Sequence, residues 1–291
     1  MRPKVVKGVR VGILGPLEVR DVAGRPAPLA GPRLRALLIR LALAGGHTVT
    51  VDRLASDLWP DERPDERPSD TANALQALVS RLRQAAGRDL VEYGSGSYRL
   101  AIDADAIDAV AFEHLAAQGR NALGTGAPSL AAGLLADALD LWRGPALADV
   151  ADAPFAAGPV ARLEELRLTA AEDLTEARLT LGQGSQLVAD VEELAAAHPL
   201  RERLRGQLMR ALYAAGRQAE ALAVYDQTRR LLADRLGVDP SPELSAIHLA
   251  ILRADPDLTP RQRQALLTSY DAFLALNGRP RRRRSRGSSR E

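Results

Sequence analysis

The sequence predicts a mainly α-helical fold with a small β part, in which an α+β segment over residues 1–107 precedes a longer all-α region. Two observations predict this division. Short apolar or alternating runs bounded by Gly and Pro, which are typical of strands, occur near residues 9–20 and 89–102. From residue 108 onward, apolar residues recur with the 3.6-residue period of amphipathic helices.

The α+β segment is expected to contain strands, then three helices, then a hairpin. Pro32 suits the first turn of a helix, and Gly45 and Gly46 end its apolar stripe. The hairpin strands are joined by Gly-Ser-Gly-Ser, a turn sequence. The expected elements are strands at residues 9–14 and 17–20, helices at 32–44, 52–59 and 71–86, and a hairpin at 89–102. This order is that of a winged helix-turn-helix with an N-terminal sheet.

The third of these helices has an unusual polar face. Its leucines fall on one side of a helical wheel, whereas the opposite side carries amides and a hydroxyl instead of Glu and Lys pairs. The residues on that opposite side are Asn73, Gln76, Ala77, Ser80 and Gln84, with Arg81 and Arg83 at its two edges. In a DNA major groove, Asn, Gln and Ser can pair with base edges, and flanking Arg side chains can bind phosphates.

The same helix can also be interpreted as an ordinary surface helix that faces water. The helix alone does not decide between these alternatives. The strands before it and the hairpin after it favour DNA binding, because a recognition helix follows a short helix and a turn. Ser97, Tyr98 and Arg99, at the start of the second hairpin strand, are then expected to lie against the neighbouring DNA backbone or minor groove.

The all-α region is expected to be a stack of paired helices. Its connections are short, and Gly216, Ala221 and Tyr225 lie at spacings similar to those of tetratricopeptide repeats, where small residues let paired helices approach. The expected helices span residues 109–123, 129–142, 160–181, 185–198, 200–215, 218–236 and 242–254, with one more at 259–277.

The composition excludes several classes of site. The sequence has no cysteine, which excludes disulfides, zinc–thiolate sites and cysteine nucleophiles and fits a reducing cytoplasm. Four histidines lie on separate predicted elements without metal-ligand spacing: His47, His114, His198 and His248. No constellation of acids, bases and nucleophiles indicates catalysis, so no enzyme activity, metal or cofactor is expected. Neither a signal peptide nor a membrane-spanning run is expected, and a cytoplasmic, nucleoid-associated location follows.

Charge is distributed unevenly along the chain. The net charge of +2 combines +2 on residues 1–110, −6 on residues 111–277 and +6 on residues 278–291. The acidic middle is interpreted as solvated helical faces. The tail carries seven Arg and almost no apolar residue, so it is expected to be disordered. It is either without consequence or a sequence-independent arm on the DNA backbone, and both alternatives stay open.

Several motifs point to a known family. In the first segment they are GILGPLEV, LASDLWP, NALQALVSRLRQAAG and SYRL. In the second they are LDLWRGPALADV, RLEELRLTAAEDLTEARLTLG and a long run from HPLRERLRGQ to LGVDPSPEL. Together these motifs resemble the antibiotic regulatory protein family of actinomycetes, which are transcription activators of secondary-metabolite gene clusters. The resemblance covers residues 9–258, and the last run is specific to the bacterial transcriptional activation domain of this family.

With this resemblance, the chain divides into four expected parts. They are an OmpR-like winged helix-turn-helix DNA-binding domain at 1–107, a tetratricopeptide-like bacterial transcriptional activation domain at 108–258, an additional helix at 259–277 and the Arg-rich tail at 278–291. The resemblance implies a side-by-side pair, or homodimer, on direct repeats in double-stranded DNA near a promoter −35 element. It also implies recruitment of RNA polymerase, including its sigma subunit.

The resemblance places the polymerase contact in the loop between the second and third helices. The residues expected to make it are Pro60, Asp61, Glu62, Arg63, Asp65, Glu66 and Arg67. Two positions depart from the family pattern. This loop contains an inserted DERP, and Ser97 stands where the family usually has Gly, which would strain the hairpin if that position needs a positive φ. No GxxxxGK[ST] motif is present, so nucleotide hydrolysis is not expected.

A second hypothesis comes from a different class of protein. Stacks of paired helices offer concave surfaces, so the all-α region could act as a scaffold or sensor for a peptide or small molecule. DNA binding by the first segment would then be secondary, or would be tuned by that ligand.

Overall fold

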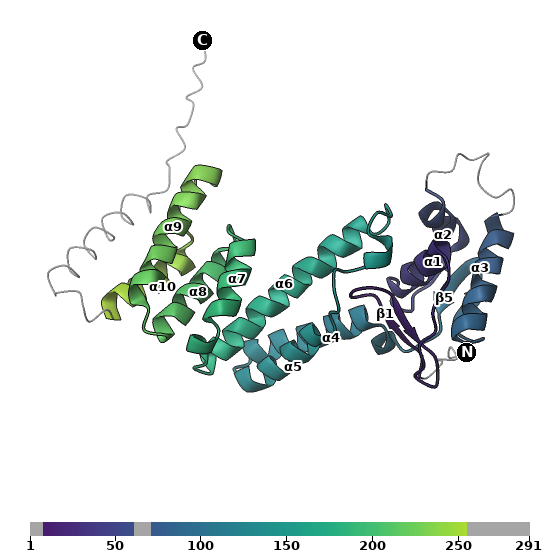
Figure 1. The fold of residues 1–291 in the computed structure, drawn as a ribbon, viewed down its shortest axis with the longest axis horizontal. Helices are drawn as coiled ribbons and strands as arrows, with labels where there is room; N and C mark the ends of the chain where they lie inside the picture. The colour runs from purple at the N-terminus through teal and green to yellow at the C-terminus, as the bar shows by residue number, and fades with distance from the viewer. Residues whose placement is uncertain (1–7, 61–70, 255–291) are drawn as a thin grey trace, which may run out of the picture. The chain divides into compact units, whose positions relative to one another are not determined.

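The computed structural model describes residues 8–60 and 71–254 of the chain (Figure 1). Most of the expected polymerase-contact loop, the expected helix at 259–277 and the Arg-rich tail lie outside the described residues. Within the described residues the fold is mainly helical with a small β part, which confirms the predicted fold class at that level.

The N-terminal segment contains strands, three helices and a hairpin in the predicted order. Its elements are β1 (Arg10–Gly12), β2 (Glu18–Arg20), α1 (Pro32–Ala42), β3 (Val49–Thr50), α2 (Val51–Leu58), α3 (Thr71–Ala86), β4 (Val91–Gly94) and β5 (Ser97–Leu100). Strands β1 and β2 form a two-stranded antiparallel sheet. Strand β5 lies between β3 and β4 in a second, antiparallel sheet. The β4–β5 hairpin therefore pairs through β5 with β3, the strand that precedes α2.

Local sequence explains the starts of the first two helices. Pro32 occupies the first turn of α1, where its missing N–H costs no hydrogen bond. Thr50 caps α2, because its Oγ1 accepts a hydrogen bond from the backbone N–H of Arg53 at 3.2 Å. The buried faces of the two helices then meet α3 through Leu37, Leu54 and other fully buried leucines.

The remaining described residues form seven α-helices and three short 3₁₀ turns. These are η1 (Ala104–Ala106), α4 (Asp108–Gly124), α5 (Pro128–Asp140), η2 (Ala148–Val150), α6 (Ala157–Thr180), η3 (Gly184–Gln186), α7 (Val188–Ala197), α8 (Glu202–Ala214), α9 (Gln218–Leu236) and α10 (Pro242–Ala254). The predicted single helix at 185–198 is wrong in one respect, because η3 and α7 divide that stretch at Leu187. None of the described helices has the length and apolar content to cross a bilayer.

Small residues let neighbouring helices approach in this region, as expected of helix pairs. A Cβ on Gly119 of α4 would lie 2.6 Å from Cγ of Leu135 on α5. A Cβ on Gly206 of α8 would lie 2.7 Å from Cδ1 of Ile247 on α10. Both distances are shorter than real Cβ contacts. The clash at Gly119 is the harder to relieve, because Cγ of Leu135 is a branch point, whereas Cδ1 of Ile247 is the end of a flexible side chain.

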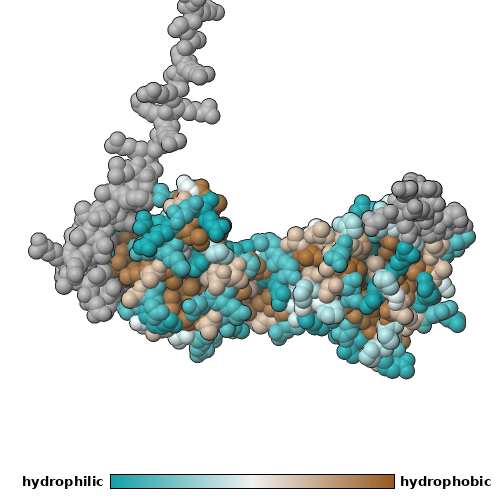
Figure 2. All heavy atoms as spheres, turned by 45° about the horizontal axis from the view of Figure 1, so that its top comes forward, coloured by the Kyte–Doolittle hydropathy of each residue, from teal (hydrophilic) through white to brown (hydrophobic). Residues whose placement is uncertain are grey.

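The described residues divide into two compact units, the first ending at Leu181 and the second beginning at Gly182. The first unit therefore contains α4, α5 and α6 together with the N-terminal strands and helices, whereas a domain boundary was expected near residue 107. On the face drawn in Figure 2, apolar and hydrophilic residues are interspersed in both units. The large apolar side chains that the described residues expose are Val22, Tyr93, Leu130, Leu181, Leu200, Leu236 and Val238.

Candidate nucleic-acid interface

Helix α3 has one buried and one exposed face, as the helical wheel predicts. The buried face consists of Leu75, Leu78, Val79, Leu82 and Ala86, each at most 4% exposed. The exposed residues of the predicted polar face are Asn73, Gln76, Ala77, Ser80, Arg81 and Gln84. The structure therefore brings six of the predicted DNA-binding residues together on one outward surface.

The packing of α3 holds this outward surface in place. Its leucines lie in the same core as Leu37 and Leu38 of α1 and Leu54 of α2. The two supporting helices are joined by Asp57, whose carboxylate accepts a hydrogen bond from Nε of Arg40 at 2.6 Å and from Nε of Arg53 at 3.0 Å. The Asp57 side chain is only 7% exposed, so water screens its pair with Arg40 weakly.

The two arginines at the edges of this face have different environments. Arg81 is exposed, so its guanidinium can extend toward a phosphate. Arg83 is half-buried and donates two hydrogen bonds to the carbonyl oxygen of Val91, from Nε at 3.1 Å and from Nη2 at 2.7 Å. In this structure Arg83 therefore joins α3 to β4, and a phosphate would have to compete with that carbonyl.

The β4–β5 hairpin follows α3 and ends in a two-residue turn. Gly94 pairs with Ser97, and the residues between them, Ser95 and Gly96, have φ angles of 48° and 71°. Two consecutive positive φ values are the pattern of a type I′ turn, which suits the twist of a hairpin. Ser97 itself does not have a positive φ, so the strain considered for a Ser at this position does not arise there. The residue with the unfavourable backbone conformation is Ser95.

The other two residues predicted on the hairpin are already engaged within the protein. Tyr98 is 4% exposed, and burial raises the pKa of its hydroxyl above the ordinary value. Arg99 is half-buried, and its Nε donates a hydrogen bond to Oε2 of Glu92 at 3.0 Å across the hairpin. Tyr98 thus belongs to the core in this structure, and Arg99 to an ion pair on the hairpin.

Sequence reasoning missed two exposed residues beside α3. Tyr93 on β4 is 59% exposed, and its ring centroid lies 4.9 Å from that of Tyr98 on the facing strand. Arg88 is exposed in the turn between α3 and β4. Period-two alternation along β4 gives no signal for the exposure of Tyr93, because it places Tyr93 on the same face as the buried Val91.

Other predicted positions lie apart from this surface or outside the described residues. Of the expected polymerase-contact residues, only Pro60 is described, and it is exposed at the end of α2. Among the described residues, no three His, Asp or Glu side chains are arranged to hold a metal ion. His114, for example, bonds to the Asp105 carboxylate through Nδ1 at 2.6 Å.

Comparison with known proteins places the helical region in a family. Residues 107–252 match the family described as "Bacterial transcriptional activator domain". The chain is 42% identical over 257 residues to "Regulatory protein AfsR" of Streptomyces griseus. The aligned region covers 88% of this chain and 26% of that protein. It therefore spans about a quarter of the length of this relative.

Shorter relatives match over most of their length. "Transcriptional regulator RedD" of Streptomyces coelicolor is 37% identical over 86% of this chain and 72% of its own length. "Regulatory protein DnrI" of Streptomyces peucetius is 34% identical over 86% of this chain and 94% of its own length. Among solved structures, EmbR of Mycobacterium tuberculosis, in complex with a low-affinity phosphopeptide, matches with a TM-score of 0.78 and 32% identity, over 94% of this chain and 72% of that one.

Proposed function

Because the chain belongs to the family of actinomycete antibiotic regulatory proteins that carry the bacterial transcriptional activator domain, we propose that it activates transcription by binding promoter DNA in a sequence-specific manner. Residues 1–107 form a winged helix-turn-helix in this proposal, with α3 in the major groove and the β4–β5 hairpin as the wing. The regulated genes are those of a secondary-metabolite cluster.

The outward surface of α3 is the observation that carries this proposal. Gln76, Ser80 and Gln84 lie on successive turns of its exposed face, where they can present amide and hydroxyl groups to base edges. Arg81 supplies a cation at one edge of that face, for a phosphate or a guanine. Glu and Lys pairs would stabilise a helix that faced only water, and these amide and hydroxyl side chains do not form such pairs.

The remainder of the proposal follows from family membership. Two copies bind side by side on direct repeats near the −35 element, and the loop at residues 60–69 contacts RNA polymerase, including its sigma subunit. The helical residues 108–258 serve as the activation domain, with a tetratricopeptide-like arrangement of helix pairs supported by the close crossings at Gly119 and Gly206.

A genome-wide footprint of the bound chain tests DNA recognition. We expect a small set of sites with a shared direct repeat, and competition binding should favour a recovered site over a random duplex of equal length by at least about 1,000-fold in affinity. Equal affinity for the two duplexes would refute sequence-specific binding.

Transcription from a recovered site tests activation separately. In a reconstituted reaction with RNA polymerase and its sigma subunit, we expect the chain to increase transcript from a promoter carrying the repeat and to leave a promoter with a scrambled repeat unchanged. A decrease in transcript at the bound promoter would identify a repressor instead.

A further inference from the structure

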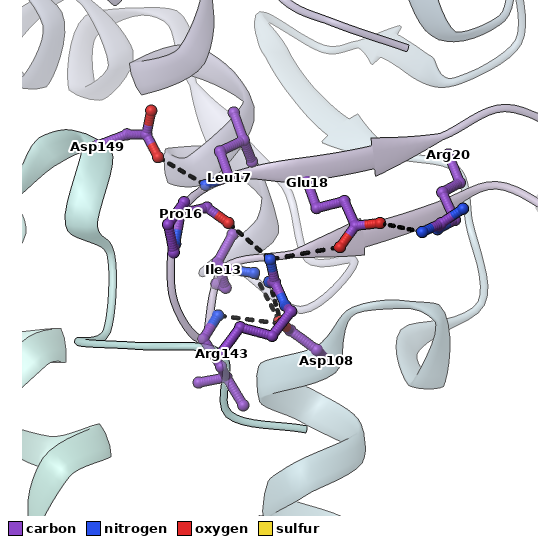
Figure 3. A network of polar contacts seen from close by, with 9 residues as sticks. Ile13, Pro16, Leu17, Glu18, Arg20, Asp108, Arg143 and Asp149 are labelled. Atoms are coloured by element: carbon purple, nitrogen blue, oxygen red, sulfur yellow. Dashed lines mark hydrogen bonds and ion pairs between the residues drawn. The ribbon is translucent and has the colours of Figure 1, made fainter. Parts of the chain in front are cut away.

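Two family motifs far apart in the sequence meet in the first compact unit. GILGPLEV, residues 12–19, contains the loop between β1 and β2. LDLWRGPALADV, residues 139–150, runs from the end of α5 through η2. The backbone N–H of Arg143 donates to the carbonyl oxygen of Leu14 at 2.8 Å, and that of Leu147 donates to Ile13 at 2.9 Å. Figure 3 shows further polar contacts between the same segments, made by Asp108, Arg143 and Asp149. We call the contacts of these three residues with the β1–β2 loop the clamp.

Two carboxylates of the helical region satisfy backbone donors of the β1–β2 loop. Asp108, the first residue of α4, accepts from Ile13 N–H at 2.7 Å through Oδ1 and from Leu14 N–H at 3.0 Å through Oδ2. Asp149 accepts from Leu17 N–H at 2.6 Å (Figure 3). The two carboxylate side chains are only 12% and 14% exposed, so these charged hydrogen bonds are poorly screened by water.

Arginines complete the clamp from both sides. The Arg143 guanidinium binds Asp108 through Nη2 at 3.0 Å and the carbonyl oxygen of Pro16 through Nη1 at 2.8 Å. From the other direction, Arg35 of α1 binds the second oxygen of Asp149 at 3.0 Å. Asp149 therefore links α1, which supports α3, to the segment that precedes α6.

The backbone fits as closely as the side chains. Gly15 has a φ of +136°, and a Cβ there would lie 3.0 Å from the backbone of Arg143 and Gly144. Ile107, beside the expected domain boundary, is fully buried and pairs with Val11 of β1 through a parallel bridge. One hydrophobic core runs through the whole unit, from the N-terminal strands to α6. A flexible linker near residue 107 is incompatible with this packing.

The first unit ends after α6, at a residue that is more exposed than Ile107. Leu181, the last residue of the unit, is 40% exposed, and Gly182 follows with a φ of +78°. Helix α6 leads to that point over 24 residues, which corresponds to about 36 Å at 1.5 Å per residue.

We propose that α4–α6 and the DNA-binding segment are one rigid body, held by the clamp, with no flexible joint at residue 107. Asp108, Arg143 and Asp149 are positioning residues in this arrangement. They fix the direction of α6 relative to α3. This inference rests on the proposed function for its role in transcription, although the rigid body itself does not.

Backbone ¹⁵N relaxation on the full chain, without DNA, tests the rigid body directly. We expect amides of α1–α3 and of α4–α6 to share one rotational correlation time and diffusion tensor. Different correlation times for these two sets in the unsubstituted protein would overturn the proposal. The measurement needs no DNA, so its result is independent of whether the protein recognises a promoter.

Arg143→Ala in the full chain tests the positioning role, with Arg162→Ala as its matched control. Arg162 on α6 pairs with Glu113 on α4 at 2.8 Å, within the helical region. We expect Arg143→Ala to lower the order parameters of the β1–β2 loop amides, to keep its affinity for a footprinted site, and to lose activation of that promoter by about 5-fold or more. Activation equal to that of the control would overturn the positioning role. So would a parallel loss of DNA affinity, because the clamp would then maintain the DNA-binding segment itself.

Discussion

The guanidinium of Arg83 and the carbonyl oxygen of Val91 form a double hydrogen bond that joins the last turn of α3 to the first residue of β4. Arg81 lies two residues earlier on the same helix and is exposed. The two arginines are the same residue type at neighbouring positions, so substituting each in turn tests whether stability and DNA binding depend on different side chains.

Arg83→Ala should destabilise the protein, whereas Arg81→Ala should weaken DNA binding. Loss of the charged donor leaves the Val91 carbonyl with weaker partners, so the free energy of unfolding should fall by about 1–2 kcal/mol in denaturant titrations. For Arg81→Ala the change should stay within about 0.5 kcal/mol. In salt titrations of DNA affinity, Arg81→Ala should lower the magnitude of the log–log slope by about 0.9. Equal destabilisation by both substitutions would contradict this assignment.

Substitution of the two hairpin tyrosines should also affect stability and DNA binding differently. Tyr98 is buried, so Tyr98→Ala should cost about 3–5 kcal/mol of unfolding free energy through lost burial and a cavity. Tyr93 is 59% exposed, and Tyr93→Ala should cost no more than the ring pair, about 0.5–1.5 kcal/mol. If the hairpin contacts DNA, Tyr93→Ala should also reduce affinity for a footprinted site. Unchanged affinity would place Tyr93 outside the interface.

The hairpin turn offers a stabilising substitution. Ser95 has a φ of 48°, which costs energy for most side chains but is tolerated by Asn, and Asn-Gly is a preferred pair for a type I′ turn. Ser95→Asn should therefore raise the free energy of unfolding by about 0.5–1 kcal/mol, measured by thermal or denaturant unfolding. Ser97→Asn is the control, since Ser97 lies in β5 without a positive φ. A gain from the control equal to that from Ser95→Asn would show that the turn is not the cause.

Helical periodicity predicted most of the described fold. Helices α9 and α10 have the predicted bounds, and the buried and exposed faces of α3 match the wheel, because a single amphipathic helix is specified by its own sequence. The interruption at Leu187 was missed, since apolar spacing cannot distinguish a continuous helix from a 3₁₀ turn followed by a helix.

The contacts that the sequence did not predict depend on partners elsewhere in the chain. Arg83 sits at the edge of a helical wheel, and only the path of β4 shows that a carbonyl lies within its reach. Asp108 and Asp149 bond to backbone groups 95 and 132 residues away, and no local pattern encodes such a pair. The bridge between Ile107 and Val11 is of the same kind, because its two residues lie far apart in the sequence.

His248 on α10 should make the stability of the second unit depend on pH. Its ring stacks on Tyr225 at a centroid distance of 3.9 Å. Burial lowers the pKa of His248 below its ordinary value of 6.5, with Asp226 opposing and Arg229 adding to that shift. The unfolded chain therefore binds this proton more readily than the folded chain does. Above pH 6.5 the ring is neutral in both states, and as the pH falls below 6.5 toward the lower folded pKa, the free energy of unfolding declines.

His248→Gln should remove this contribution, because glutamine does not titrate. Denaturant unfolding of the full chain at about pH 7.5 and about pH 5.5 measures the loss of unfolding free energy on acidification for each protein. We expect the unsubstituted chain to lose more than His248→Gln does, since the other titrating groups are common to both. His198→Gln, at an exposed histidine, is the matched control and should lose as much as the unsubstituted chain. If His248→Gln and the unsubstituted chain lose equal free energy, His248 does not link folding of this unit to proton binding.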